Sequence, residues 1–490
     1  MHECRCSDPI FLLELLFGEE DGRKMAEWLR QRLKGFSPPA APAPLDQKDA
    51  LLVTSVDQFY SPGFPSLQTL RDVAAHLLRE NVTGLHLTAS LETGERAENQ
   101  AEQHSIALDD SSREEFSWLG REYLLMLDVP AYHFDEQNPQ NLQKAVENLL
   151  FPVENCVKLL CIKDISLQGE KTIPPSSDAM MSQLVVNFYN ALLASVAPGV
   201  LLVCDKKGTH SEIISCFGNG YNAAHLVTDH SLSPLLLHAI QQGDAGLLSE
   251  WVGALRLPST RVSFYNTLPY RVETDLRPLQ GILNEAAIRL MQAQLQGLGQ
   301  EADSQGGQGT AYFDVLAGAG GGLPITRQVQ RLLASLAIQL ALVGLPGIDA
   351  RNLFWQPGST PGERFDRQVL TTRLADAHNP AARVYHDTCR LLRARASCPA
   401  FHPHGAQLVL PMQNAVFSLL RISADGMQAA LCLHNLSSEE QHVEAGKSGQ
   451  SGQLGAGTWC DLFSGNLLNL SQDRLVLRGY QVLWLVPQGQ

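Results

Sequence analysis

Residues 199–239 read GVLLVCDKKGTHSEIISCFGNGYNAAHLVTDHSLSPLLLHA. Two β-rich runs, 199–205 and 224–230, stand on either side of a polar stretch, and a leucine-rich helical pattern begins at residue 231. Strands that alternate with helical patterns predict parallel strands joined by helical crossovers. This segment therefore predicts an α/β fold.

The same alternation continues on both sides of this segment. Seven to eight repeats of a strand followed by a helix predict a (β/α)₈ barrel. Polar composition predicts a loop on the barrel rim over 92–115 and a second loop over 297–310. The expected strands are 51–56, 84–89, 123–129, 156–162, 199–205, 224–230 and 262–268, and the expected helices are 66–81, 141–151, 179–196, 231–255, 281–296, 325–343 and 383–396.

Composition changes divide the chain into three parts. We predict an N-terminal helix with a Pro/Ala linker over 1–45, because SPPAAPAPL at 37–45 cannot be helical. The barrel is expected over 46–400. Short strands separated by Gly, Ser and Asn turns predict an antiparallel β domain over 401–490.

Charge and cysteine content restrict the class of protein. The net charge of −14 repels phosphate backbones, so we expect no nucleic-acid partner. No apolar run is long enough to span a membrane, and the acidic N-terminal segment lacks the features of a signal peptide. Ten scattered cysteines, several of them in apolar strands, favour a reducing cytoplasm.

Segment 199–239 also resembles a known family. Its strand, asparagine-rich loop and leucine-rich helix are similar to those of sucrose phosphorylases and glucosylglycerate phosphorylases, a branch of the α-amylase superfamily. The resemblance implies a (β/α)₈ TIM barrel with a reduced inserted domain and a C-terminal antiparallel β domain. Further similar segments are 17–33, 47–58, 332–354, 399–410 and 479–487.

The family resemblance implies a double displacement at a sugar carbon, which needs a nucleophile, an acid/base and a third carboxylate. In this alignment Leu160 occupies the position of the nucleophile, and Lys158 replaces an arginine. Asp205 occupies the acid/base position, where the family has glutamate. Arg271 and Val272 replace a His-Asp pair. Of the family's three catalytic carboxylates, one is therefore expected to remain, and it is an aspartate in place of the longer glutamate.

Two further residues match the family's sugar pocket. Asp128 and His133 align with an Asp-x-x-x-x-His element that contacts the sugar in the family. The alternative is that Asp128 caps a turn and His133 packs in the rim. The family's domain that covers the substrate is reduced here to FDEQNPQ at 134–140, and its second-strand loop is replaced by SLETGERAENQ at 90–100.

Other groupings offer weaker sites. His2, Cys4 and Cys6 lack a fourth metal ligand at a recognisable spacing, and His402 and His404 are better explained as a polar junction. The glycines at 318–322 lack the Lys-Ser/Thr of a phosphate-binding loop. We therefore expect neither a metal site nor a cofactor.

Two functional hypotheses follow. The first is a catalytically inactive barrel with a binding, regulatory or scaffolding role in carbohydrate or compatible-solute metabolism. Its partners would be an active paralogue, a second copy of itself or a sugar-like ligand. The second is a divergent phosphorylase or glycoside hydrolase with a site rebuilt around Asp205, Asp128, Lys206 and Lys207. Converging polar residues at the barrel face would favour ligand binding or altered chemistry.

Overall fold

The computed structural model describes most of the chain, and the chain forms two compact units. The N-terminal unit comprises Met1–Pro44, Leu51–Asp229 and Leu257–Tyr265, and the C-terminal unit comprises Leu45–Ala50, His230–Arg256 and Asn266–Gln490. The residues described are 8–37, 43–78, 82–88, 90–92, 105–107, 110–129, 139–163, 175–272, 275–299, 311–318, 322–355, 364–444, 457–470 and 474–488.

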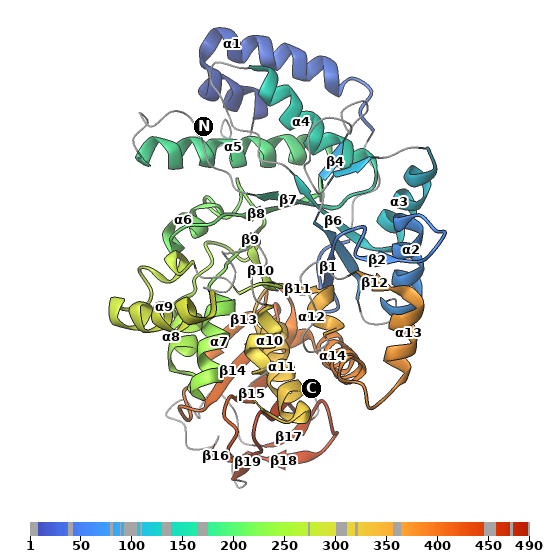
Figure 1. The fold of residues 1–490 in the computed structure, drawn as a ribbon. Coiled ribbons are helices and arrows are strands. Elements are labelled where there is room, and N and C mark those ends of the chain that lie inside the picture. Colours follow the sequence, from blue (N-terminus) through green and yellow to red (C-terminus); the bar gives the residue numbers. More distant parts are fainter. Residues whose placement is uncertain are drawn as a thin grey trace. The chain divides into compact units, whose positions relative to one another are not determined.

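The predicted barrel is confirmed. Its strands follow the order β1-β11-β10-β9-β8-β7-β6-β3 and close on themselves (Figure 1). Pairing is parallel wherever the register is defined, as the strand–helix alternation predicts. The strands are β1 Leu51–Thr54, β3 Gly84–Leu87, β6 Leu124–Val129, β7 Leu159–Lys163, β8 Leu201–Asp205, β9 Leu226–Thr228, β10 Ser263–Leu268 and β11 Leu345–Asp349.

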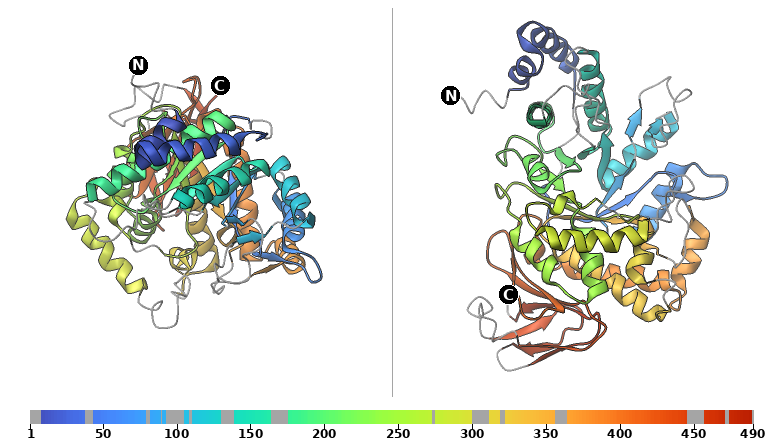
Figure 2. Two further views of the ribbon diagram at one scale, coloured as in Figure 1. Left: turned by 90° about the horizontal axis from the view of Figure 1, so that it is seen from above. Right: turned by 60° about the vertical axis from the view of Figure 1, so that its left-hand side comes forward.

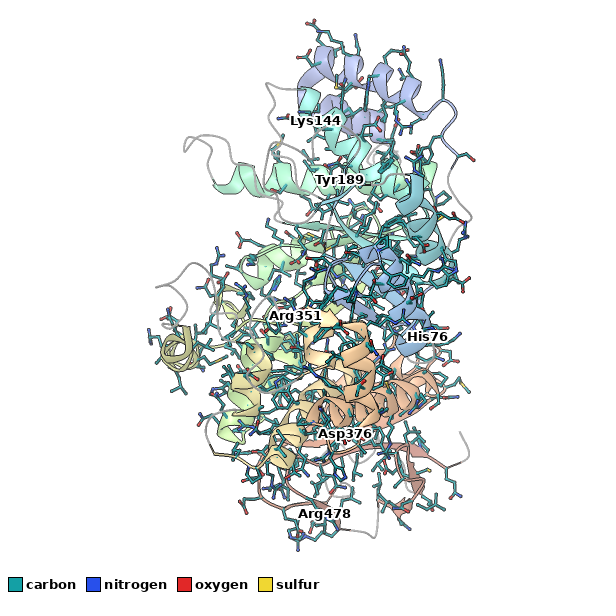
Figure 3. All side chains as sticks on the ribbon, turned by 45° about the vertical axis from the view of Figure 1, so that its right-hand side comes forward. His76, Lys144, Tyr189, Arg351, Asp376 and Arg478 are labelled. Atoms are coloured by element: carbon teal, nitrogen blue, oxygen red, sulfur yellow. The ribbon has the colours of Figure 1, made fainter. Side chains whose placement is uncertain are left out.

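The helices of the N-terminal unit present buried apolar faces and exposed polar faces. Tyr189 on α5 is buried, whereas Lys144 on α4 is exposed (Figure 3). The N-terminal helix α1 packs against α5 and bends at Gly18, whose φ is 77° (Figure 2). The helices are α1 Pro9–Leu33, α2 Ser66–Val73 with a π turn at Ala74–Leu78, α3 Asp110–Glu122, α4 Pro139–Glu154, α5 Pro175–Val196 and α6 His210–Ser215.

The helices of the C-terminal unit include the long helix α11. Helix α11 is buried along almost its whole length, which explains its broad apolar face. No helix among the described residues is long and apolar enough to cross a membrane. The helices are α7 Leu232–Gln242, α8 Gly246–Ala254, α9 Glu285–Gly299, α10 Tyr312–Ala317, α11 Ile325–Ala341, α12 Ala350–Leu353, α13 Arg367–Ala375 and α14 Pro380–Ala396, with 3₁₀ turns at Arg277–Leu279 and Pro399–Phe401.

Two expectations about local structure are wrong. The stretch 231–255 is two helices rather than one, because Gly243 ends α7 in a left-handed conformation with φ 65°. The stretch 92–115 is not wholly a loop, since β4 (Ser90–Glu92), β5 (Ser105–Ala107) and the start of α3 lie in it. Residues 93–104 and 300–310 lie outside the described part of the chain.

The C-terminal β domain is confirmed as antiparallel. A six-stranded sheet has the order β13-β14-β15-β20-β17-β18, and its buried face includes Leu420, Leu431, Trp459 and Leu485. The central strands β14 and β15 are buried along almost their whole length, whereas β17 alternates half-buried and buried residues. The strands are β13 Ala406–Val409, β14 Val416–Ile422, β15 Ala429–Asn435, β17 Thr458–Asp461, β18 Leu467–Asn469 and β20 Val482–Pro487, with β16 Gln441–Val443 paired to β19 Leu475–Leu477. Outside this domain, β2 Phe59–Tyr60 and β12 Phe365–Asp366 are two further short strands.

Candidate functional site

Asp128 is the centre of a polar cluster toward the carboxyl ends of the barrel strands. Its Oδ1 lies 2.8 Å from His86 Nε2 on β3, and its Oδ2 lies 2.7 Å from Lys163 Nζ on β7. Burial alone would raise the pKa of Asp128, but the charge and hydrogen bond of His86, followed by those of Lys163, lower it below its usual range. Asp128 is therefore a carboxylate anion held by two neighbours.

Lys163 supplies the positive charge of this cluster. Its side chain is 39% exposed, so it lies at the open edge of the cluster rather than in the core. Burial opposes the charge, but Asp128 and then the more distant Asp205 raise the pKa of Lys163 above its usual value. Lys163 therefore stays protonated at neutral pH.

His86 connects the cluster to another strand of the barrel, β10. Its Nδ1 lies 2.9 Å from the hydroxyl of Tyr265 on β10, and the two rings meet edge to face with centroids 5.6 Å apart. Both side chains are buried. Because both ring nitrogens have partners, the orientation of His86 is defined on two sides.

Cys161 completes the cluster from β7. It pairs in register with Asp128, and its sulfur, His86 and Asp128 each offer one atom within 4.8 Å of the others. The thiol is fully buried, and burial, followed by the charges of Asp128 and Asp205, raises its pKa well above its usual value. Cys161 is therefore a protonated thiol at neutral pH.

Asp205 ends the neighbouring strand β8 and pairs in register with Lys163. Residues that pair across parallel strands point to the same side of the sheet. Asp205 therefore lies on the same face as Cys161 and Lys163, and its charge acts on both of them. Of the two lysines that follow it, Lys206 is half-buried and Lys207 is exposed.

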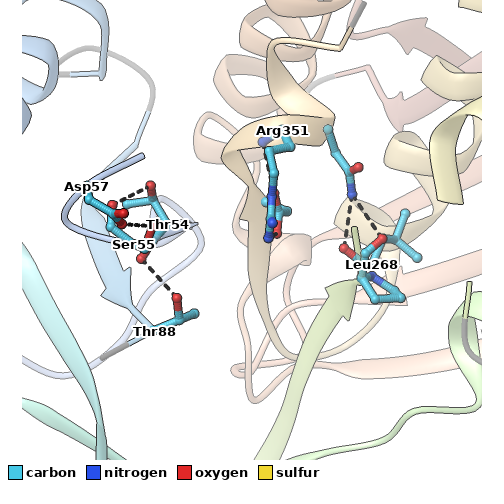
Figure 4. A network of polar contacts seen from close by, with 9 residues as sticks. Thr54, Ser55, Asp57, Thr88, Leu268 and Arg351 are labelled. Atoms are coloured by element: carbon cyan, nitrogen blue, oxygen red, sulfur yellow. Dashed lines mark hydrogen bonds and ion pairs between the residues drawn. The ribbon is translucent and has the colours of Figure 1, made fainter. Parts of the chain in front are cut away.

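At the end of β1, polar groups serve local turns. The hydroxyl of Ser55 donates to Asp57 Oδ1 at 2.7 Å, and the hydroxyl of Thr88 donates to the carbonyl of Thr54 at 3.4 Å (Figure 4). Side chains that bond to nearby main-chain or turn groups stabilise the turn itself. These residues therefore shape the strand end.

A second local arrangement follows β11 in the C-terminal unit. Arg351 binds both carboxylate oxygens of Asp349, at 3.0 and 2.8 Å, and its guanidinium lies 4.1 Å from the ring centre of Tyr270 (Figure 4). Asn352 Nδ2 donates to the carbonyl of Leu268 at 3.0 Å. A bidentate pair beneath an aromatic ring is a rigid arrangement. Sequence analysis did not identify it.

Comparison with known proteins agrees with the barrel. No family model matches the sequence. A glucosylglycerate phosphorylase from Allomeiothermus silvanus is 26% identical over 561 aligned positions, covering 97% of each chain. The chain is therefore similar in sequence to glucosylglycerate phosphorylases over nearly its whole length.

Solved structures of this superfamily share the fold. A sucrose 6F-phosphate phosphorylase from Thermoanaerobacter thermosaccharolyticum superimposes with a TM-score of 0.61 at 10% identity, covering 81% of this chain and 95% of that chain. An α-amylase from Geobacillus thermoleovorans, complexed with acarbose, has a TM-score of 0.59 at 10% identity, covering 91% and 100%. These similarities confirm the barrel fold.

The structure shows which residue of β7, the strand aligned with the family's nucleophile, lies beside Asp128. Leu160 pairs with Leu127 and Leu202, whereas the next residue, Cys161, pairs with Asp128. Successive side chains of a strand point to opposite faces, so Leu160 faces away from the polar cluster. A slip of one residue exchanges the two faces of a strand. The residue of β7 beside Asp128 is therefore Cys161, not Leu160.

Lys158 does not belong to the polar cluster. It precedes β7, where its main-chain N–H donates to the carbonyl of Leu125 at 2.9 Å. Five residues separate it from Lys163, which corresponds to about 16 Å along a strand. The cation beside Asp128 is Lys163, and a ligand-binding role for Lys158 stays a prediction.

The remaining predicted site residues fall elsewhere. Arg271 is exposed and forms an isolated β-bridge with Ala311, and Val272 is half-buried. Both lie in the C-terminal unit. His133 lies outside the described residues, as do the predicted weak ligands at positions 2, 4 and 6. Asp128 and Asp205 are therefore the predicted site residues that the structure places at the barrel strand ends.

The two faces of β7 allow a direct test. Leu160→Ser should destabilise the protein by roughly 3–5 kcal/mol, because it leaves a cavity and an unpaired hydroxyl among leucines. Cys161→Ser should cost at most about 1 kcal/mol, because a hydroxyl can donate to Asp128 as the thiol does. Urea unfolding in a buffer with a metal chelator measures both. Equal losses would contradict the assigned faces of the strand.

Proposed function

We propose that this chain is a catalytically silent member of the phosphorylase branch with a binding or regulatory role. The observation that supports this most strongly is Cys161, a buried and protonated thiol on the inner face of β7. Retaining glycosyl transfer needs a nucleophilic carboxylate about 5–5.5 Å from a second carboxyl group. A protonated thiol in this place cannot attack a sugar carbon.

The remaining carboxylates of the cluster are poorly suited to replace the nucleophile. Asp128 is held on both oxygens, by His86 and by Lys163, and its pKa is lowered. A carboxylate of low basicity in a fixed ion pair gains little by attacking carbon. Asp205 has a shorter side chain than the glutamate of the family, and a misplacement of about 1 Å can cost a hundredfold in rate.

We also propose that the polar face binds a sugar-like ligand. Asp128, Lys163 and Asp205 provide acceptors and donors of the kind that bind sugar hydroxyls, and they lie at the carboxyl ends of the strands, where barrel proteins bind ligands. The free cysteines of the described residues support a reducing cytoplasm as the place of action. An active relative or a second copy remains our proposal for a protein partner.

Incubation with glucosylglycerate or sucrose plus phosphate tests the absence of activity. We expect no glucose 1-phosphate above a protein-free blank, because no nucleophile is available at Cys161. An active glucosylglycerate phosphorylase assayed in parallel sets the detection limit. Release of glucose 1-phosphate that Asp205→Ala abolishes, and that Asp57→Asn preserves, would establish the enzyme hypothesis instead.

Calorimetric titration of the same protein with glucosylglycerate separates ligand binding from a scaffold role. Binding should weaken at least tenfold in Asp205→Asn, because a charged acceptor is replaced by an amide. Asp57→Asn, at the end of another strand, serves as the control for a lost carboxylate. An absence of binding to the intact protein would leave the silent barrel as a scaffold and reject the ligand proposal.

A further inference from the structure

We propose that His86, Asp128 and Cys161 form a zinc-binding site at the barrel strand ends. The three residues come from three consecutive strands of the sheet, β3, β6 and β7, and supply a nitrogen, an oxygen and a sulfur atom. These atoms lie within 4.8 Å of one another, and the side chains are almost entirely shielded from solvent. This inference is independent of whether the barrel is catalytically silent.

The neighbours of the three ligands already orient them. Tyr265 holds His86 through Nδ1 at 2.9 Å, which directs Nε2 toward Asp128. Lys163 holds Asp128 through Oδ2 at 2.7 Å, which leaves Oδ1 directed toward His86. Zinc ligands are typically fixed in this way by hydrogen bonds from a second set of residues. The ammonium group of Lys163 therefore lies on the carboxylate oxygen that the zinc ion does not use.

The spacing of the ligand atoms suits a tetrahedral ion. Zinc bonds of about 2.0–2.3 Å place neighbouring ligand atoms about 3.3–3.7 Å apart. The distance of 2.8 Å between His86 Nε2 and Asp128 Oδ1 needs to widen by only about 0.5 Å for the ion to enter between them. The other pairs of ligand atoms, which lie within 4.8 Å of each other, need to approach by at most about 1 Å.

The donor set favours zinc over the common hard cations. Magnesium and calcium select oxygen ligands, whereas imidazole and thiolate favour zinc. Binding releases the thiol proton of Cys161 to solvent, and the proton on His86 Nε2 is exchanged for one on Nδ1, which then donates to Tyr265. The thiolate, Asp128 and the neighbouring Asp205 carry three negative charges, which balance the divalent ion and Lys163 together. Three protein ligands leave a fourth position for water or a ligand oxygen.

Zinc titration and cobalt substitution test the site. The full-length protein, treated with chelator and then reconstituted with zinc, should bind one ion per chain by elemental analysis. Cobalt in the same site should show the near-ultraviolet charge-transfer absorption of a thiolate ligand. Cys161→Ser should abolish that absorption. Tyr265→Phe should weaken zinc binding by about 10–100-fold in competition with a zinc-sensitive dye, while keeping all three ligands.

Cys204→Ser is the matched control. Cys204 is a buried cysteine on the adjacent strand β8, but it lies on the face opposite to its neighbour Asp205 and so outside the cluster. This variant should keep the zinc and the cobalt absorption. Circular dichroism and thermal unfolding identify any variant that fails to fold, and Asp128→Asn provides a second ligand variant in that event. Sub-stoichiometric zinc in the folded wild-type protein, or a cobalt spectrum that survives Cys161→Ser, would overturn the proposal.

Discussion

Arg395→Met should destabilise the C-terminal unit by more than about 3 kcal/mol, because it removes the partner of several buried carbonyl groups. The guanidinium is buried, and each of its N–H groups donates to a main-chain carbonyl. Four of the five donor–acceptor distances are 3.0 to 3.2 Å. The five carbonyls belong to Gln47, Asp49, Leu340, Gly344 and Phe401.

This arrangement explains why an arginine without a carboxylate can be buried. Gln47 and Asp49 come from the segment before β1, Leu340 from α11, and Phe401 from the turn that leads to the C-terminal sheet. One planar group with five donors therefore joins segments that are far apart in sequence. A lysine has three donors in a different geometry and cannot satisfy all five carbonyls.

Chemical denaturation of three variants separates the hydrogen bonds from the charge. Arg395→Met should show the full loss, and Arg395→Lys should show a smaller but substantial one. Arg393→Met, an exposed arginine on the same helix, should change stability by no more than about 0.5 kcal/mol. Equal stability of the Arg395→Met and Arg393→Met proteins would show that the buried network contributes nothing.

Acidification should destabilise the C-terminal β domain through His434. Its side chain is buried between two partners, and burial lowers its pKa to about 3, although the hydrogen bond to Phe417 opposes this shift. Nδ1 lies 3.3 Å from the carbonyl of Phe417, and Nε2 accepts a hydrogen bond from Trp484 Nε1 at 3.3 Å. Protonation of Nε2 replaces the acceptor that Trp484 uses with a donor.

The sign of the effect follows from the two pKa values. Because the folded-state pKa of His434 lies below the value of about 6.5 in the unfolded chain, the unfolded chain takes up the proton first. The stability contribution is therefore complete above about pH 6.5 and is lost as the pH falls toward 3. Between neutral pH and pH 5 the loss should be about 2 kcal/mol.

Thermal unfolding of wild-type protein and His434→Gln at pH 7.5 and pH 5 measures this contribution. The pH-dependent loss should be about 2 kcal/mol smaller in His434→Gln, because glutamine does not titrate. His378→Gln, which replaces an exposed histidine, should keep the wild-type dependence. If His434→Gln and the wild-type protein lose stability equally between the two pH values, His434 is not the group responsible.

The fold was largely predictable because the alternation of strands and helices is a local property of the sequence. Each of the seven predicted barrel strands overlaps an observed strand, and the similar segment at 332–354 contains the eighth. Helix α3 was missed because its sequence, DSSREEFSWLGRE, is mostly polar and has few apolar positions to define a helical period. The break at Gly243 was missed because glycine within a helical pattern does not always end the helix.

The candidate site was only partly predictable. Asp128 and Asp205 were identified from the family resemblance, whereas His86, Cys161 and Lys163 were not assigned to the site. The three proposed metal ligands are separated by more than 30 residues each, so no short spacing pattern connects them. Only the pairing of neighbouring strands brings them together.

The amino-acid sequence by itself determined the barrel and the C-terminal sheet, because these follow from local periodicity and recognisable segments. Tertiary structure alone decided which residues of β7 face the polar cluster. The run LLCIK is buried on both faces of the strand, so its hydrophobicity does not distinguish one face from the other. The register with Asp128 makes that distinction, and it places Cys161 rather than Leu160 in the site.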